Sequence, residues 1–126
     1  MSSLQQLDKA RLLLHQYLSI HLITLKFEPK LARIHAILRD NVQLYIRYNN
    51  HGEYSYSILF SKTALDRCRY DNYDDRWEVL TRPNHFHPRK NKEAFQSIMT
   101  GNPEKDIPLL CELILSGKLY DIDYLD

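Results

Sequence analysis

The chain has 126 residues, and its 17 lysines and arginines nearly balance its 16 aspartates and glutamates, so the formal net charge is +1. This length is typical of one domain, which we expect to span residues 1–126. A hydrophobic content of 44% with three glycines and five prolines excludes collagen-like and generally disordered chains. Because the total charge is close to zero, any site for a polyanion must be a local basic patch.

The sequence predicts neither a membrane span nor a secretory signal. The longest apolar run near the N-terminus, at residues 12–14, is followed at once by His15 and Gln16, and no segment approaches the roughly 20 apolar residues of a membrane helix. Cys68 and Cys111 are too few for a disulfide framework, so both are expected to be reduced, buried thiols. We therefore expect a cytoplasmic protein without a membrane partner.

The first two thirds of the chain predict one helix and a meander of strands. Apolar residues recur at intervals of three and four over residues 3–18, which predicts an amphipathic helix. Alternating patterns then predict strands over residues 20–27, on both sides of Asp40 and Asn41 within residues 31–48, and over residues 54–59 after a turn. Residues 64–70 and 77–80 continue this strand pattern around a polar connection.

Two more helices are predicted near the C-terminus. Asn91 can cap a helix over residues 92–100 that Gly101 ends, and Asp106 can cap a last helix that has Pro108 in its first turn and stops at Gly117. Together, these elements predict an α+β fold. An antiparallel meander sheet of five or six strands, over about residues 20–81, packs against the N-terminal helix and the two C-terminal helices.

The densest polar segment is residues 67–92, and its second half holds cations and histidines without any carboxylate. These residues are Arg82, His85, His87, Arg89, Lys90 and Lys92. Two histidines beside arginine and lysine suit RNA strand cleavage, which needs a base for the 2′-hydroxyl, an acid for the leaving oxygen and cations for the phosphate charge. The alternative is a basic surface loop without activity. The acidic tail, with Asp121, Asp123 and Asp126, offers a weak intramolecular mask of this patch.

A metal site at the same histidines is a second interpretation. On an extended segment His85 and His87 point to the same side, and Asp71, Asp74 or Asp75 can complete a ligand set, although the neighbouring cations would repel a divalent ion. Cysteine catalysis is not favoured, because the sequence around Cys68 offers no nearby base. With three glycines the chain has no phosphate-binding glycine loop and no nucleophile elbow.

Three short motifs follow one another in an order that resembles the TumE family of toxin–antitoxin systems. They are Tyr54-Ser55-Tyr56, the turn Arg69-Tyr70-Asp71-Asn72, and Pro83-Asn84-His85-Phe86-His87 ahead of Lys90. The resemblance covers roughly residues 30–100. Where the family commonly has histidines soon after the turn, this chain has Tyr73, Asp74, Asp75 and Arg76, so chemistry that depends on those histidines would be altered here.

The resemblance implies a small α+β toxin with a cognate antitoxin as its partner. By analogy with other small toxins it also implies cleavage of messenger or transfer RNA, which requires no cofactor or metal. It adds Arg69 and Asp71 to His85 and His87 as expected catalytic residues, whereas Arg69 salt-bridged to a carboxylate and Asp71 folded onto its own turn would be purely structural. The residues expected to contact RNA are Tyr70, Arg82, Arg89, Lys90 and Lys92.

A catalytically silent module that binds RNA or protein through the same patch is the alternative function. The two functions differ in what the histidines do. In the enzyme they exchange protons with the substrate, whereas in the binding module only the arginines and lysines matter. The sequence leaves the formation of a homo-oligomer open.

Overall fold

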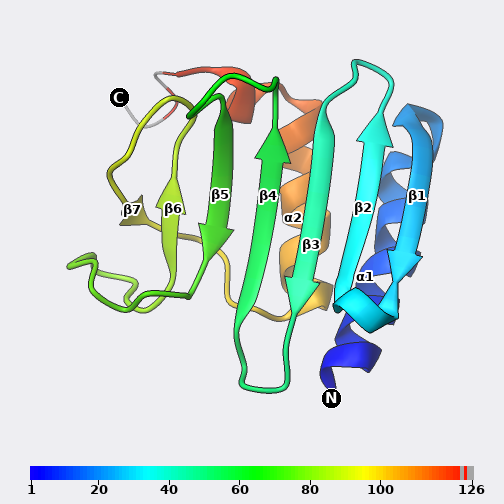
Figure 1. Ribbon diagram of the computed structural model, residues 1–126, viewed down its shortest axis with the longest axis horizontal. Coiled ribbons are helices and arrows are strands. Elements are labelled where there is room, and N and C mark those ends of the chain that lie inside the picture. The colour runs from blue at the N-terminus through cyan, green and yellow to red at the C-terminus, as the bar shows by residue number, and fades with distance from the viewer. Residues whose placement is uncertain (123, 125–126) are drawn as a thin grey trace.

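In the computed structural model, which describes residues 1–122 and 124, two helices cover one face of an antiparallel sheet (Figure 1). Seven described strands lie side by side in chain order. They are β1 (Leu22–Glu28), β2 (Arg33–Leu38), β3 (Gln43–Tyr48), β4 (Tyr54–Leu59), β5 (Arg67–Asp71), β6 (His85–His87) and β7 (Phe95–Gln96). The helices are α1 (Ser3–Leu18) and α2 (Pro103–Leu115), with single 3-10 turns at Ser19–His21, Pro29–Leu31 and Lys118–Tyr120.

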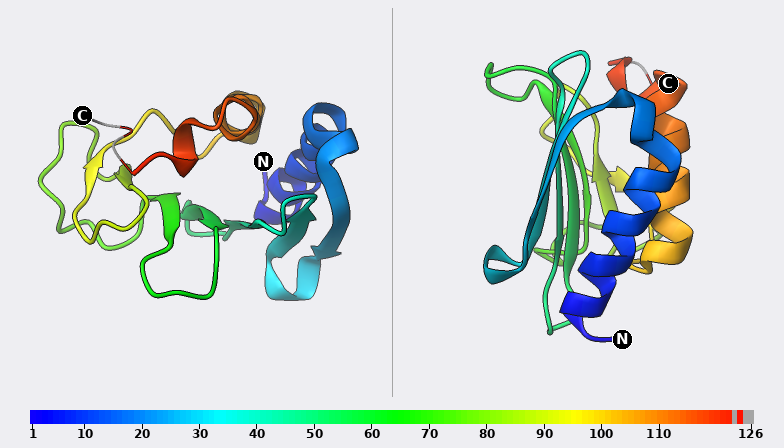
Figure 2. Two further views of the ribbon diagram at one scale, coloured as in Figure 1. Left: turned by 90° about the horizontal axis from the view of Figure 1, so that it is seen from above. Right: turned by 90° about the vertical axis from the view of Figure 1, so that its right-hand side faces the viewer.

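Helix α1 has the boundaries that the apolar spacing predicts. Ser2 caps it, because its hydroxyl accepts a hydrogen bond from the backbone N–H of Gln5 while the Gln5 side chain bonds back to the backbone N–H of Ser2. The helix buries a stripe of four residues against the sheet, namely Leu7, Ala10, Leu14 and Leu18. Figure 2 shows both helices on the same side of the sheet, so the opposite face, which we call the outer face, carries no helix.

Alternation along the strands separates the core from the outer face. The hairpin between β2 and β3 turns at Asp40 and Asn41, as predicted, and Asn41 takes a positive φ of 65°. Every second residue of these strands is buried under the helices, including Ile34, Ala36, Leu44 and Ile46. The residues between them therefore point to the outer face.

The prediction of the last helix is right about its end and wrong about its start. Helix α2 begins at Pro103, where the side chain of Asn102 accepts a hydrogen bond from the N–H of Glu104. Asp106 lies inside the first turn, 1% exposed, and accepts hydrogen bonds from the N–H groups of Thr100 and Gly101. It therefore caps the segment that precedes the helix instead of the helix itself.

The predicted helix over residues 92–100 does not form, and this segment holds the short strand β7. Its backbone N–H groups bond to side chains instead of to helical carbonyls: Ser97 to the Thr81 hydroxyl, Met99 to the Ser97 hydroxyl, and Thr100 to Asp106. Residues 77–80 form a loop instead of a strand. Strands β6 and β7 lie beyond the predicted limit of the sheet, so the described strands number seven instead of five or six.

Two smaller predictions concern the cysteines and the membrane. Cys68 and Cys111 are both buried free thiols, as expected, and burial raises the pKa of each to about 12. They are therefore protonated and inert at neutral pH. Among the described residues, no helix has the length and apolar character to cross a membrane.

Candidate active site

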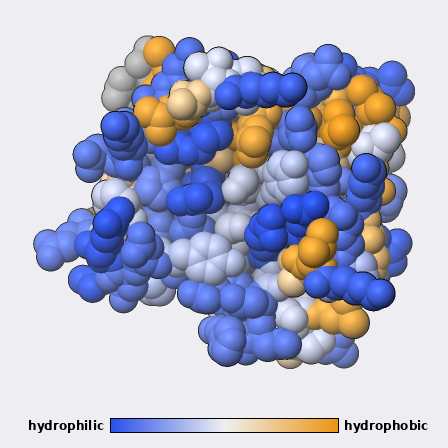
Figure 3. Space-filling view, viewed as in Figure 1, coloured by the Kyte–Doolittle hydropathy of each residue, from blue (hydrophilic) through white to orange (hydrophobic). Residues whose placement is uncertain are grey.

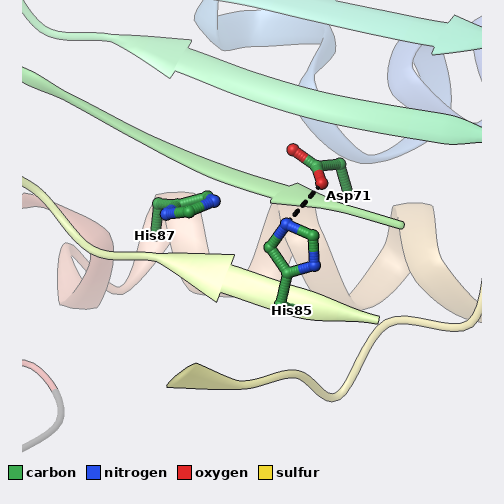
Figure 4. A group of neighbouring side chains, drawn as sticks. All are labelled: Asp71, His85 and His87. Atoms are coloured by element: carbon green, nitrogen blue, oxygen red, sulfur yellow. Dashed lines mark ion pairs between the residues drawn. The ribbon is translucent and has the colours of Figure 1, made fainter. Parts of the chain in front are cut away.

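Two neighbouring strands bring an aspartate and two histidines together on the outer face. Asp71 ends β5 and pairs in register with His85 of β6, and Arg69 pairs with His87. Alternation then places all four side chains on the same face, while Tyr70 and Phe86 point to the helices. One ligand atom from each of Asp71, His85 and His87 lies within 4.8 Å of the others, and we call these three residues the Asp-His-His cluster (Figure 4).

Asp71 and His85 share a buried proton. The Nε2 atom of His85 lies 2.7 Å from Oδ1 of Asp71, and its Nδ1 lies 3.0 Å from the carbonyl oxygen of Pro83. Because a carbonyl only accepts, Nδ1 carries a hydrogen, and one further proton must lie between Nε2 and the carboxylate. Burial raises the pKa of Asp71, against the opposing effects of Arg69 and His85. The pair is therefore a proton donor held inside the protein.

His87 has the opposite protonation. Its Nδ1 donates a hydrogen bond to the carbonyl oxygen of Glu93, 3.1 Å away, which leaves the lone pair on Nε2. The side chain is 5% exposed, and burial together with the charges of Arg69 and His85 lowers its pKa to about 4. His87 is therefore neutral at pH 7 and presents a basic nitrogen beside the Asp71–His85 pair.

Arg69 is the cation nearest to this cluster. Its guanidinium Nε forms an ion pair with Oδ2 of Asp71, and the arginine side chain is 44% exposed. Oδ2 is buried, and the Arg69 guanidinium is its partner in this ion pair. Because the arginine is partly exposed, its guanidinium can also reach an incoming anion.

The Asp-His-His cluster also has the composition of a metal site. Both histidines fix Nδ1 on a main-chain carbonyl and leave Nε2 for a ligand bond, as metal-binding histidines do. A divalent ion would have to enter between Nε2 of His85 and Oδ1 of Asp71 and would lie close to the Arg69 guanidinium. Of the three aspartates considered from the sequence, Asp71 is the one that joins the histidines; Asp74 and Asp75 pair with Arg76 and Arg82 in the loop.

Comparison with protein-family models decides the affiliation. The model of the toxin TumE family matches residues 10–114, which is most of the chain and more than the motifs indicated. The chain belongs to the TumE toxin family. Its membership gives the protein a toxin role and points to an antitoxin as its partner. Comparison with curated proteins and with solved structures gave no match.

The other residues expected to bind RNA do not line the Asp-His-His cluster of this TumE-family chain. Tyr70 is buried on the helix side of β5, where it stacks on Phe86, so its ring is closed to a substrate. Arg82 pairs with Asp75, and Arg89 pairs with Asp66. Lys90 and Lys92 are exposed.

The sequence interpretation missed the residue that covers the histidines. The ring of Trp77, from the loop over residues 72–84, lies edge-on to His87 at 5.3 Å between ring centroids and 6.1 Å from His85. The sequence pattern predicts a strand over residues 77–80, and the available signal for a role in the site is that Trp77, the chain's single tryptophan, follows a polar segment. In the acidic tail, Asp123 and Asp126 lie outside the described residues.

Proposed function

We propose that this TumE-family toxin is a metal-independent ribonuclease whose reaction uses the Asp-His-His cluster and Arg69. One observation carries the proposal. The two histidines of one strand differ in their partners: Nε2 of His85 lies 2.7 Å from Oδ1 of Asp71, whereas His87 donates from Nδ1 to the Glu93 carbonyl and keeps a lone pair on Nε2. A neighbouring acid and base are what cleavage of an RNA strand requires.

The reaction follows from these protonation states. Nε2 of His87 removes the proton of a ribose 2′-hydroxyl, and the resulting oxygen attacks the adjacent phosphorus. The bond from phosphorus to the 5′-oxygen breaks, and that oxygen takes the proton held between Asp71 and His85. The products are a 2′,3′-cyclic phosphate and a 5′-hydroxyl end. Arg69 lies close enough to His87 to offset the charge that grows on the phosphate oxygens.

A catalytically silent binding module is the second candidate, and burial favours it. Asp71 is 0% exposed, His85 1% and His87 5%, and Trp77 lies against both histidines. RNA reaches the Asp-His-His cluster only when the loop that carries Trp77 moves. In a silent module this loop stays closed and the histidines serve the fold alone.

The test is the variant His87→Asn, because the asparagine amide can still donate to the carbonyl of Glu93. We expect it to lower RNA cleavage by about 100- to 10,000-fold and to relieve growth arrest when the gene is expressed in cells. The matched control is His15→Asn on the exposed side of α1, which should cleave as the wild type does. Circular dichroism and thermal melting check that both variants fold.

The chemistry of the product separates the two candidates. Cleavage by this route leaves 2′,3′-cyclic phosphate ends, which mass spectrometry detects, and RNA with 2′-O-methyl groups should bind without being cut. Wild-type and His87→Asn chains that both bind RNA, cleave none and leave growth unchanged would establish the silent module. Cleavage that produces 3′-hydroxyl ends would rule out this reaction.

A further inference from the structure

The outer face carries a line of polar and aromatic side chains that ends at the Asp-His-His cluster. Strand register makes these residues direct neighbours, one per strand from β1 to β6. They are Lys26, His35, Tyr45, Ser57, Arg69 and His87, which we call the basic row. Strands lie about 4.8 Å apart, so the row is roughly 24 Å long.

A second line runs beside the basic row and reaches the other histidine. Arg33 of β2 pairs with Arg47 of β3, Arg47 with Ser55, Ser55 with Asp71, and Asp71 with His85. Arg33 forms an ion pair with Glu28 at 2.9 Å, whereas Arg47 forms none with any carboxylate in the described part of the chain. The first line therefore carries Lys26 on β1 and Arg69 on β5, and the second carries Arg47 two strands away from Asp71.

The centre of this face is a shallow hollow with an aromatic wall. Arg33, Tyr45, Arg47, Ser57 and Leu59 line a depression of about 360 Å³. The small side chain of Ser57 leaves room between Tyr45 and Arg69, which flank it in register. Figure 3 shows the face mainly hydrophilic, as a surface that contacts a charged backbone would be.

Aromatic contacts lie within the hollow, between β2 and β3. The rings of His35 and Tyr45 stack at 4.3 Å with an angle of 5° between their planes, and the Arg33 guanidinium lies 5.6 Å from the Tyr45 ring. Burial raises the pKa of Tyr73, and so does the Glu53 carboxylate, while Arg47 and Arg69 oppose the rise. Tyr73 therefore lies near both arginines, where the second line approaches Asp71.

We propose that the outer face binds single-stranded RNA along the basic row and delivers it to the Asp-His-His cluster. Arginines that approach phosphates and rings on which bases stack are the two contacts that single strands need. An open antiparallel sheet with exposed aromatic side chains is a known way to present them. The face is too short for the two successive minor grooves by which double-stranded RNA is usually recognised. This inference rests on the proposed function for its choice of RNA.

Binding is measured with a fluorescent, fully 2′-O-methylated single strand, which cannot be cut by attack of a 2′-hydroxyl. The first variant is Arg47→Gln, with Lys105→Gln on the exposed side of α2 as a control of equal charge. One lost phosphate contact reduces the slope of log affinity against log salt by about 0.7. This predicts a weakening of about eightfold at about 50 mM salt and about threefold at about 200 mM. The control should stay within about twofold.

Two further substitutions test the aromatic and the central positions. Tyr45→Leu keeps apolar bulk and removes the stacking ring, and should weaken binding by about five- to 150-fold. Ser57→Glu and Ser57→Gln have the same size, so the difference between them isolates charge in the middle of the row. We expect the glutamate variant to bind several-fold more weakly than the glutamine variant.

The outcomes distinguish this proposal from the proposed function. Binding that depends on Arg47 in a protein that cleaves nothing supports the RNA surface and removes the ribonuclease. Cleavage that persists while Arg47→Gln and Tyr45→Leu bind as the wild type does overturns the RNA surface alone. Equal competition by poly-glutamate and by unlabelled RNA would show a general polyanion surface, suited to an acidic antitoxin segment, and would also overturn it.

Discussion

The lowered pKa of His87 makes a prediction about how stability changes with pH. In the unfolded chain a histidine has a pKa of 6.5, and in the folded protein His87 has a pKa of about 4. Between these values the unfolded chain binds a proton that the folded protein does not, so acid favours unfolding. The stabilisation is complete above pH 6.5 and disappears as the pH falls through about 4.

The difference of 2.5 in pKa corresponds to about 3 kcal/mol once the pH is below both values. At about pH 5 roughly 2 kcal/mol of this has been lost. The groups that surround His87 are Arg69, His85, Trp77 and the Glu93 carbonyl, and its neighbour Asp71 contributes in the opposite direction because its own pKa is raised. A comparison with His87→Asn therefore isolates the histidine.

Urea unfolding followed by circular dichroism measures the free energy of unfolding at about pH 7.5 and about pH 5. We expect the wild type to lose about 2 kcal/mol more than His87→Asn between these conditions. An NMR titration of the His87 ring gives the pKa directly. Equal losses in the two proteins, or a ring that titrates near 6.5, would refute the account of a buried neutral histidine.

Three other predictions follow from the fold and the site. Asp106→Asn should lower the free energy of unfolding by about 3 kcal/mol, because donors from Tyr56, Thr100 and Gly101 converge on this carboxylate. An effect below about 1 kcal/mol in urea unfolding would contradict this. Gly101→Ala should destabilise the folded protein by about 2 kcal/mol, because the φ angle of Gly101 is 90° and the new Cβ would lie 2.9 Å from Cδ1 of Tyr54. A melting temperature equal to that of the wild type would disprove this. Chelation with EDTA should leave RNA cleavage unchanged, and loss of activity that zinc restores would instead identify the Asp-His-His cluster as a metal site.

Local patterns were sufficient for the first five strands and for α1. Residues 3–18 hold a helical apolar stripe together with a capping box, and strong alternation in β2, β3 and β4 agrees with the turns between them. In these elements propensity, burial and turn chemistry favour the same structure. The antiparallel meander and the α+β class could therefore be predicted correctly.

The errors lie where side chains from distant segments take the backbone hydrogen bonds. Residues 92–100 have helical apolar spacing, but two of their N–H groups bond to side chains outside the segment. The N–H of Ser97 bonds to Thr81, which is far away in sequence, and the N–H of Thr100 bonds to Asp106, which lies inside the next helix. Strand β6 has only three residues, all of them buried, so the alternation of His85, Phe86 and His87 is too short to predict a strand. Its pairing with β5 depends on tertiary contacts and not on local sequence.

The candidate site was predictable in its chemistry and only partly in its geometry. His85 and His87 had to point to one side of an extended segment, and the resemblance supplied Arg69 and Asp71. Cross-strand register brings these four together, and no sequence pattern specifies register across the long loop of residues 72–84. The outer-face arginines could have been found, because they occupy the positions between the apolar residues of β2 and β3.

The two proposals converge on Arg69. It is the neighbour of His87 in the basic row, and its guanidinium also pairs with Asp71, whose pKa it lowers while burial raises it. Arg69 contacts Asp71 through Nε, so its two terminal nitrogens remain able to offer a phosphate a planar pair of donors. In the proposed reaction, a phosphate bound by Arg69 weakens the effect of this cation on Asp71, which helps the Asp71–His85 pair to keep its proton until the phosphate is in place. If both proposals hold, RNA binding on the outer face favours the protonated form of the acid that the proposed cleavage step uses.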